Sequence, residues 1–469
     1  MTISKLRGRR RVLAVASLAV AVFAVGGVVG SAHAGAVTPA VHQIVVSPQL
    51  RGPVAKTGNV TFGCQARPMD GSAGPRCYQP AQLQKAYDVA PLLASGVNGA
   101  GRTIVIVDAY GSPTIASDLQ IFDSTFGLPN PTFTQITPAG SPPPFDINDA
   151  NQFGWSVETT LDVEYAHAIA PNANIVLAIA ASNNDADILA TTKAVIDNNV
   201  GDVISQSFGE AEACMDPSLL AQQHQLFAEA AQKGITVFAS SGDSGAAQPA
   251  CTGDGALLSA STPASDPNVT GVGGTTLTAD PSTGAYIGET AWTEPFGCNP
   301  PAVAFSDVNC SGGGFSSLFT RPSFQASTFR GAGHTTGRGV PDVAYNAGVS
   351  GGVLIHCGTC NIAIAGLPAT APVFFIIGGT SAGSPQWAGL AALGDQLAGR
   401  RLGMINTALY AIGNAKPQYA KAFHDITQGN NDVAEINGGY DAGPGWDPVT
   451  GLGTPDAAAL LPLLVSHTS

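Results

Sequence analysis

A serine stands at the point where the sequence predicts that a buried strand runs into a helix. The segment Gly379-Thr380-Ser381-Ala382-Gly383 follows the apolar residues Val373 to Ile377, and a helix is expected to start near Ser381. A hydroxyl at such a junction is presented at a sheet edge, where the first N–H groups of the helix can stabilise developing negative charge. An ordinary helix N-cap at Thr380 or Ser381 has the same pattern. The motif alone favours a nucleophile and a helix cap equally.

A serine nucleophile needs a general base, and the histidines offer no recognisable one. The chain has no His-Gly-Thr motif, and several histidines stand isolated from any motif, namely His167, His224, His334, His356 and His424. We therefore interpret these histidines as structural residues.

Carboxylates are the alternative source of a base. Glu158 and Asp162 are four residues apart and share one face of a predicted helix. Like charges at this spacing are unfavourable by about 0.2–0.5 kcal/mol, unless the pair shares a proton and its apparent pKa values move apart. Spacing alone favours a solvated acidic face that includes Glu164. Asp243 lies in a turn after an apolar strand, where an Asp usually makes local hydrogen bonds but, when protonated, can donate to an oxyanion.

The elements that carry these residues alternate between strands and helices. Strands are expected at Arg102–Val107, Asn174–Ala180, Asp202–Ser205 and Ile235–Ala239, with helices at 116–126, 155–168, about 185–198 and about 217–233. This alternation predicts an α/β fold with a parallel sheet covered by helices on both faces. Asp108, Ser207 and Asp243 are expected just past strand ends, where such sheets bind ligands.

Composition narrows the classes of function. The chain has 469 residues, of which 44% are hydrophobic and only 11% charged, and its formal net charge is −13. An acidic chain has little with which to neutralise phosphates, so we expect no nucleic-acid partner. The low charge suits an extracellular protein, and an acidic surface loses net charge as pH falls. We expect protein or peptide substrates and a monomer.

The N-terminus is typical of a signal peptide over residues 1–34. A basic region around Arg9-Arg10-Arg11 precedes the apolar stretch Val12–Val29, and Ala32-His33-Ala34 is a small-x-small cleavage site. The alternatives are a membrane anchor, because the stretch is near spanning length, and twin-arginine export. We expect secretion without stable membrane association, an irregular lead-in or short pro-segment at 35–77, and a catalytic domain at 78–466.

Eight cysteines in an exported chain indicate disulfides. The sequence leaves 105 full pairings open. Pairing of neighbours predicts 64–77, 214–251, 298–310 and 357–360. Cys357-Gly358-Thr359-Cys360, with His356 beside it, has redox or metal-binding alternatives, although a zinc site would need further ligands.

Taken together, the motifs resemble the sedolisin family of serine-carboxyl peptidases over roughly residues 78–460. Glu158-x-x-x-Asp162, Ser-Gly-Asp243-Ser-Gly and Gly-Gly-Thr-Ser381-Ala occur in family order. Further similar segments are Val272-Gly-Gly-Thr275, Arg338-Gly-Val-Pro-Asp342-Val and Gly445-Trp-Asp447-Pro-Val-Thr-Gly-Leu-Gly-Thr-Pro455.

The resemblance implies a subtilisin-like fold and a secreted endopeptidase that works in acid. By position, Ser381 is the nucleophile, Glu158 its general base, Asp162 the carboxyl that orients Glu158, and Asp243 the oxyanion stabiliser. The resemblance also implies one structural Ca²⁺, with the carboxylates of Asp425 and Asp447 and the carbonyls of Ile426, Gly443 and Gly445 as ligands. An oxygen-only set on a Gly-rich loop suits this ion.

The sequence departs from the family in an outer network and in its N-terminal region. Asp108 stands where a Glu is common and Phe208 where a Trp is common, and Phe has no N–H donor. The residues between the signal and Tyr78 are too few for the large folded pro-domain of the family. The competing hypotheses are a catalytically silent relative that binds peptides or surfaces, and a thiol or metal enzyme built on Cys357 and Cys360.

Overall fold

The structure is a computed structural model of the chain. It describes residues 43–46, 48–54, 56, 62–66, 76–252, 255–294, 309–328, 336–433, 436 and 438–468. Within these ranges, none of the helices combines the length and the apolar character needed to cross a bilayer.

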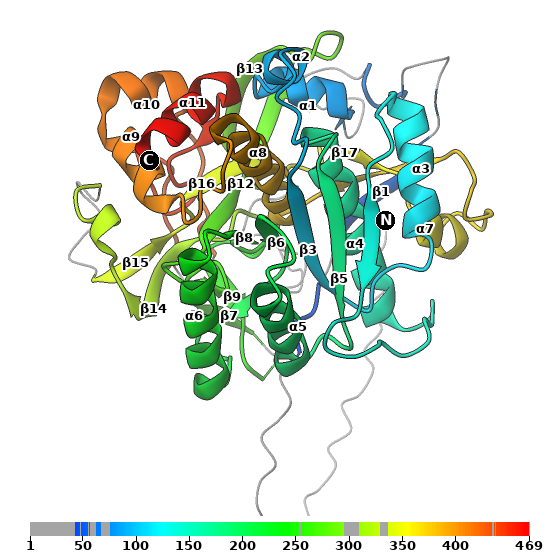
Figure 1. The fold of residues 1–469 in the computed structure, drawn as a ribbon, viewed down its shortest axis with the longest axis horizontal. Coiled ribbons are helices and arrows are strands. Elements are labelled where there is room, and N and C mark those ends of the chain that lie inside the picture. The colour runs from blue at the N-terminus through cyan, green and yellow to red at the C-terminus, as the bar shows by residue number, and fades with distance from the viewer. Residues whose placement is uncertain are drawn as a thin grey trace, which may run out of the picture. The chain divides into compact units, whose positions relative to one another are not determined.

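An eight-stranded sheet organises the domain (Figure 1). Its strands are β3 (Thr103–Ala109), β4 (Phe133–Ile136), β5 (Asn174–Ala180), β6 (Val203–Gln206), β8 (Thr236–Ser240), β12 (Thr270–Ala279), β13 (Tyr286–Ala291) and β16 (Val343–Asn346). They run in the order β13-β12-β8-β6-β3-β5-β4, and β16 also pairs with β12. Every pairing is parallel except that of β12 with β13. This is the mostly parallel sheet that the alternation of elements predicted.

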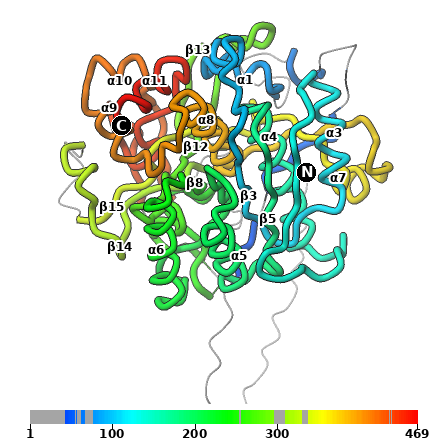
Figure 2. The backbone as a smooth tube through the Cα atoms, viewed as in Figure 1, coloured from blue at the N-terminus to red at the C-terminus, as the bar shows by residue number. Residues whose placement is uncertain are grey.

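Helices cover both faces of this sheet. Side chains of β3 alternate between two clusters: Ile104 and Ile106 pack with α4 (Ala150–Ile169) and α8 (Gly383–Ala398), whereas Val105 and Val107 pack with α5 (Asp185–Asp197) and α6 (Pro217–Gln232). The backbone trace in Figure 2 shows α5 and α6 close to each other, with α8 in another part of the fold. A strand buried on both faces needs no polar alternation, which explains its continuous apolar run.

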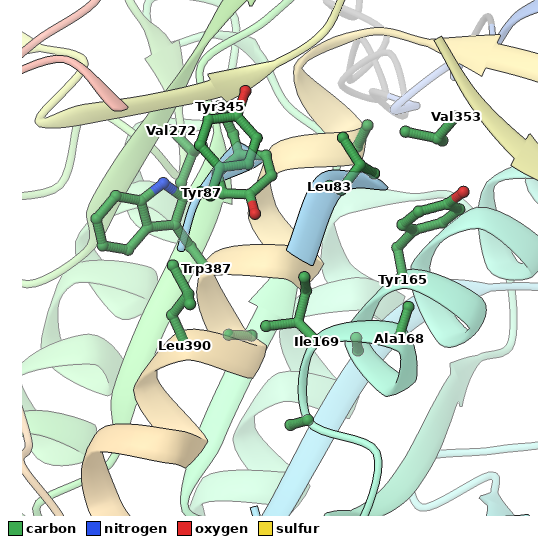
Figure 3. Packing of buried hydrophobic residues seen from close by; sticks show 14 of the residues in the cluster. Leu83, Tyr87, Tyr165, Ala168, Ile169, Val272, Tyr345, Val353, Trp387 and Leu390 are labelled. Atoms are coloured by element: carbon green, nitrogen blue, oxygen red, sulfur yellow. The ribbon is translucent and has the colours of Figure 1, made fainter. Parts of the chain in front are cut away.

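A core of large aromatic side chains holds α8 and α4 together (Figure 3). The rings of Tyr87 and Tyr345 lie 4.0 Å apart between centroids. Trp387 on α8 is 1% exposed, and its Nε1 donates to the Ala344 carbonyl oxygen at 3.0 Å. Because Trp387 lies on the helix that follows Ser381, this core fixes the position of the nucleophile candidate.

Two element boundaries differ from the sequence prediction. The helix expected at 155–168 begins at Ala150, because Asp149 caps it by accepting a hydrogen bond from the Gln152 N–H at 3.0 Å. Asp108 was expected just past a strand end, and this was wrong: β3 continues through Asp108 to Ala109, since its ladder with β5 extends to Ala180. The other helices of the parallel region lie within one residue of expectation, including α3 (Ile115–Phe126).

A second, four-stranded sheet carries the strand that leads to Ser381. Its order is β1 (Gln49–Val54), β18 (Phe374–Gly378), β17 (Gly352–Ile355) and β2 (Cys77–Tyr78). The prediction of an irregular lead-in at 35–77 was therefore wrong for residues 49–54. Local sequence did not reveal this strand because its antiparallel partner, β18, lies far downstream, with Gln49 opposite Gly378.

Smaller elements complete the fold. The remaining helices are α1 (Pro80–Ala86), α2 (Ala90–Ala94), α7 (Gly358–Ala363), α9 (Asn406–Asn414), α10 (Lys416–Ala422) and α11 (Ala457–His467), with 3-10 turns η2 (Ser323–Gln325) and η3 (Thr380–Ala382). Short strand pairs are β7 (Glu210–Ala211) with β11 (Ser261–Thr262), β9 (Ala247–Pro249) with β10 (Ala256–Leu258), β14 (Gly314–Thr320) with β15 (Gly337–Val340), and β19 (Phe423–His424) with β20 (Thr454–Pro455).

The disulfides follow neighbour pairing as far as the described residues test it. Cys64–Cys77, Cys214–Cys251 and Cys357–Cys360 are bonded, as predicted. Cys310 is also in a disulfide, and its predicted partner Cys298 lies outside the described residues. Since none of the described cysteines is free, the redox interpretation of Cys357 and Cys360 has no thiol to work with in this state.

Candidate active site

Ser381 lies in η3, the single 3-10 turn between β18 and α8. The helix expected to start near Ser381 begins at Gly383 instead. Gly379, just before the turn, has a φ of 110°, and a Cβ there would lie 2.6 Å from Asp243 Oδ2. Only glycine therefore lets the chain turn this tightly beside Asp243. The Ser381 hydroxyl donates to the Ser207 carbonyl oxygen at 3.1 Å.

Glu158 and Asp162 lie on a helix that is buried almost all round. Their side chains are 1% and 0% exposed, which excludes a solvated acidic face. Glu164 is also fully buried, but it accepts a hydrogen bond from the His356 N–H at 3.1 Å and belongs to a different polar cluster. The helix therefore presents two of its carboxyl groups to the region of Ser381.

Burial raises the pKa of Glu158 well above its usual range. The nearby Ser381 hydroxyl opposes this shift as a hydrogen-bonding neighbour, and the charges of Asp108 and Asp243 reinforce it. Burial also raises the pKa of Asp162, with further repulsion from Asp108 and Glu158. Both groups therefore sit in surroundings that favour the protonated form, which is the setting in which carboxyls act as acids and bases.

Asp108 is the third member of this carboxyl cluster. Burial raises its pKa to about 7, against the opposing effect of the Thr159 hydroxyl. Among the described residues, neither Lys nor Arg forms an ion pair with Asp108, Glu158 or Asp162. Three adjacent buried carboxyls without a cation cannot all be ionised, so the cluster holds shared protons near neutrality.

Asp243 is hydrogen-bonded to the turn that carries Ser381. Its Oδ1 accepts hydrogen bonds from the Thr380 N–H at 2.8 Å and the Thr380 hydroxyl at 2.7 Å. Burial raises the pKa of Asp243, and these two hydrogen bonds oppose the shift. With Oδ1 occupied by donors, a proton on this carboxyl belongs on Oδ2, the oxygen closest to Gly379. That oxygen can then donate a hydrogen bond.

One cavity of about 220 Å³ joins these groups. Its lining includes Glu158, Asp243 and Ser381 together with wall residues Ser207, Phe208, Gly209, Gln248 and Pro249, and it also includes residues of the N-terminal region, Val45, Val46, Pro48 and Gln49. The structure thus brings together the four residues of the predicted catalytic set, since Asp162 stands one helical turn beyond Glu158. Sequence reasoning missed the N-terminal residues, for which no local signal exists.

The outer network takes a different form from the family pattern. Asp108 is close enough to Glu158 and Asp162 to influence the pKa of both. Phe208 instead lies in an apolar cluster, with its ring 5.5 Å from that of Trp155 on α4. Phe208 therefore extends no hydrogen-bond chain, and no local sequence pattern indicates that Trp155 fills the neighbouring space.

The predicted calcium ligands lie on one loop. The Asp425 carboxylate accepts hydrogen bonds from the Gly445 N–H at 3.0 and 3.2 Å, and Asp447 Oδ2 accepts one from the Gly443 N–H at 3.1 Å. Burial raises the pKa of Asp447 to about 6. Ile426, whose carbonyl completes the predicted set, is 2% exposed.

The described residues contain no group of three or more His, Cys, Asp or Glu side chains that could hold a metal ion. The predicted set has only two carboxylates, and its other ligands are backbone carbonyls. Oxygen donors of this kind fit a hard cation such as Ca²⁺, and the buried Asp447 would gain a compensating charge.

The histidine beside the cysteine pair has a structural environment. His356 Nδ1 lies 3.3 Å from Asp118, and its Nε2 lies 2.9 Å from the Ala371 carbonyl oxygen. With Cys357 and Cys360 joined to each other, no ligand set for zinc is assembled here. His167 similarly pairs with Asp123 at 3.1 Å and lies outside the cavity.

Comparison with known proteins agrees with this geometry. The subtilase family profile matches residues 148–403. Kumamolisin from Bacillus sp. (strain MN-32) is 36% identical over 410 residues, which cover 85% of this chain and 65% of kumamolisin. Sedolisin from Pseudomonas sp. (strain 101) is 31% identical over 387 residues, covering 82% of this chain and 60% of sedolisin. The chain thus spans less than two thirds of the length of these curated relatives.

A solved structure shows the same fold. Pseudomonas sedolisin, described as a serine-carboxyl proteinase and complexed with two molecules of pseudo-iodotyrostatin, matches with a TM-score of 0.69 at 30% sequence identity. The match covers 84% of this chain and 99% of that one. The predicted subtilisin-like architecture is thereby confirmed. The chain belongs to the subtilase family and, within it, to the sedolisin group of serine-carboxyl peptidases.

Proposed function

We propose that this protein is a secreted endopeptidase that hydrolyses proteins in acid through Ser381, Glu158 and Asp162, with Asp243 as oxyanion stabiliser. The observation that carries the proposal is the single cavity lined by Ser381, Glu158 and Asp243. A nucleophile, a base and a donor for the oxyanion are the groups that acyl transfer requires.

In the first half-reaction, the Ser381 hydroxyl turns from the Ser207 carbonyl towards Glu158, which has one oxygen free of hydrogen bonds. Glu158, in its ionised form, takes the hydroxyl proton as the Ser381 oxygen attacks the scissile carbonyl carbon, while the shared protons of the cluster lie on Asp108 and Asp162. Asp162 orients Glu158 and carries part of the shared protons of the carboxyl cluster. Glu158 then returns the proton to the leaving amine, and the C–N bond breaks.

In the second half-reaction, Glu158 activates a water molecule that attacks the acyl ester. The ester C–O bond breaks, and the proton returns to the Ser381 oxygen. In both halves, protonated Asp243 donates from Oδ2 to the carbonyl oxygen as negative charge develops on it. An ionised Asp243 has no proton to donate and would repel that charge, so the mechanism requires acid.

The course of the chain through the cavity supports endopeptidase activity. Val45, Val46 and Pro48 line the cavity, and so does Gln49, the residue at which β1 begins its pairing with β18. A cavity through which a polypeptide segment passes can accommodate a substrate that extends in both directions from the scissile bond. Export is supported by the signal-like N-terminus and by the disulfides.

The proposed Ca²⁺ is structural. Asp425 and Asp447 would hold it with the carbonyls of Ile426, Gly443 and Gly445, and its charge would offset the burial of Asp447. The loop lies outside the cavity, so the ion has no part in the chemical step.

The test is hydrolysis of a denatured protein over a range of pH, with Ser381→Ala as the inactive variant. Ser124→Ala is the matched control, because Ser124 is exposed on α3 and makes only a local hydrogen bond to the Ile121 carbonyl. We expect turnover in acid by the wild type and the control, and none by folded Ser381→Ala. Wild-type turnover by folded Ser381→Ala would exclude Ser381 as the nucleophile.

A further inference from the structure

The side chain of Ser207 has no part in the chemistry described above, although this residue lines the cavity. Ser207 directly follows the last residue of β6 and is only 1% exposed. The mechanism uses its carbonyl oxygen alone, to which the Ser381 hydroxyl donates at rest. A buried hydroxyl so close to the nucleophile has a second set of neighbours to serve.

The Ser207 hydroxyl donates to the backbone of the nucleophile. Its Oγ lies 3.2 Å from the Ser381 carbonyl oxygen, while the Ser381 hydroxyl donates to the Ser207 carbonyl oxygen at 3.1 Å. In a regular α-helix, the Ser381 carbonyl would accept from the residue four positions on, which is Pro385 and has no N–H. The Ser207 hydroxyl therefore supplies a donor that Pro385 cannot, and it ties the end of β6 to the turn of the nucleophile.

The same hydroxyl is a neighbour of Asp162. Burial raises the pKa of Asp162, repulsion from Asp108 and Glu158 adds to this shift, and the Ser207 hydroxyl opposes it as a hydrogen-bonding neighbour. Asp108 acts from β3 and Glu158 from the same helix as Asp162, whereas Asp243, which follows β8, acts on Glu158. The titratable groups that act on Asp162 are thus carboxyls, and Ser207 is a neutral donor beside them.

The single proton of the Ser207 hydroxyl cannot serve both neighbours at once. In this structure it goes to the Ser381 carbonyl, and neither carboxyl oxygen of Asp162 accepts a hydrogen bond from the described residues. A buried carboxylate without a donor or a cation is costly, so this arrangement fits a protonated Asp162. When Asp162 ionises, the Ser207 hydroxyl is placed to rotate towards it, and the Ser381 carbonyl then loses this donor.

We propose that Ser207 is a positioning residue that couples the proton on Asp162 to the turn that carries the nucleophile. Its hydroxyl holds the Ser381 carbonyl while Asp162 is protonated, and it rotates to Asp162 when this carboxyl is ionised. No proton passes through Ser207, which only changes the acceptor of its own hydroxyl proton. This role rests on the proposed peptidase function, to which it adds a second requirement for acid besides the proton on Asp243.

Infrared titration tests the coupling without relying on hydrolysis. The measured quantity is the pH at which the C=O stretching band of protonated Asp162 disappears, and the band is identified by its loss in Asp162→Asn. Ser207→Ala removes the donor to the ionised carboxylate, so the band should persist to a pH about one unit higher than in the wild type.

Ser205→Ala is the matched control. Ser205 is a buried residue of the same strand, and its hydroxyl pairs with the Ser384 hydroxyl at 2.8 Å. Its substitution therefore also removes a buried hydroxyl near α8, but it should leave the Asp162 band at the pH of the wild type.

Kinetics on a fluorogenic peptide test the positioning of the nucleophile. In acid, kcat of Ser207→Ala should fall about two- to tenfold with KM unchanged, because the lost hydrogen bond holds the nucleophile and not the substrate. Ser207→Thr keeps a hydroxyl and should restore both kcat and the pH of the Asp162 band. Ser207→Cys, whose thiol is a weak donor, takes the place of the Ala variant if that variant folds poorly.

Disappearance of the Asp162 band at the same pH in Ser207→Ala and the wild type would overturn the proposal. Equal losses of kcat in Ser207→Ala and Ser205→Ala would also overturn it, because both hydroxyls would then have only a structural role. Absence of acid proteolysis in the wild type would count against the proposed function, and the infrared titration would still decide the coupling.

Discussion

Replacing Asp243 with Asn tests whether a proton on this residue sets the acid dependence that we propose for catalysis. In the wild type, Oδ1 is held by the Thr380 N–H and hydroxyl at 2.8 and 2.7 Å. The Asn carbonyl oxygen can accept the same two hydrogen bonds, which leaves its NH₂ group at the position of Oδ2. The variant therefore supplies a neutral donor to the oxyanion at every pH.

The expected magnitudes follow from this geometry. In the wild type, the donating form is fully present below the pKa of Asp243, which burial raises above 3.8, and it is lost about tenfold per pH unit above that pKa. Asp243→Asn removes this loss, so the alkaline limb of kcat/KM should move to higher pH. Asp243→Ala removes the donor altogether and should lower kcat by about 10²–10³, equivalent to about 2.7–4 kcal/mol.

The assay is kcat/KM on a fluorogenic peptide from strongly acid to neutral pH for the wild type and both variants. Asp197→Asn is the matched control, because Asp197 is exposed and pairs only with Lys193 at the surface. The reasoning is refuted if Asp243→Asn is active and keeps the alkaline limb of the wild type. In that case another member of the carboxyl cluster sets the limb.

Three further predictions concern stability. A chelator should lower the melting temperature, and Asp447→Ala should lower it similarly, because a cation that binds only the folded state stabilises that state by mass action. Calorimetry measures both melting temperatures, with Asp441→Ala as an exposed control from the same region. The free energy of unfolding should fall as pH rises from acid towards neutral. Burial raises the pKa of Asp395 to about 7 and, with repulsion from Asp185, that of Glu210 to about 8, so the folded state binds more protons than the unfolded state across this range. A larger free energy of unfolding in urea at neutral pH than in acid would contradict this. Arg338→Met should destabilise the fold by about 3–5 kcal/mol. In the wild type, the Asp342 carboxylate lies 2.7 Å from the Arg338 guanidinium, and the substitution leaves this carboxylate buried without its cation. Urea unfolding measures the loss, with Arg400→Met as a surface control.

The sequence was sufficient to single out the residues that the cavity brings together, because each member of the proposed catalytic set lies in a short motif. Ser381 and Asp243 follow apolar strands, and their roles depend on the local turn. The positions of Glu158 and Asp162 were harder to predict, since the spacing of acidic residues four apart by itself favours a solvated face. Only tertiary packing shows that this helix is buried all round, because the covering elements come from distant parts of the chain.

Other features could not be predicted because they depend on long-range contacts. The pairing of Gln49 with Gly378 joins residues from opposite ends of the chain, and no local pattern encodes it. The strand around Asp108 continues past its carboxylate because β5 continues beside it, whereas a charged residue usually indicates a strand end. Trp155 fills the space beside Phe208, which a residue-by-residue comparison with the family could not show.

The disulfides have a consequence for how the protein reaches its folded state. Each of the three disulfides among the described residues joins cysteines that are consecutive in the chain, with separations of 13, 37 and 3 residues. In the export that we propose, the chain enters an oxidising compartment N-terminus first, so each of these cysteines can meet its correct partner before the next cysteine arrives. Folding of this protein should then depend little on disulfide isomerase, which catalyses the slow rearrangements that are needed when non-native pairs form first.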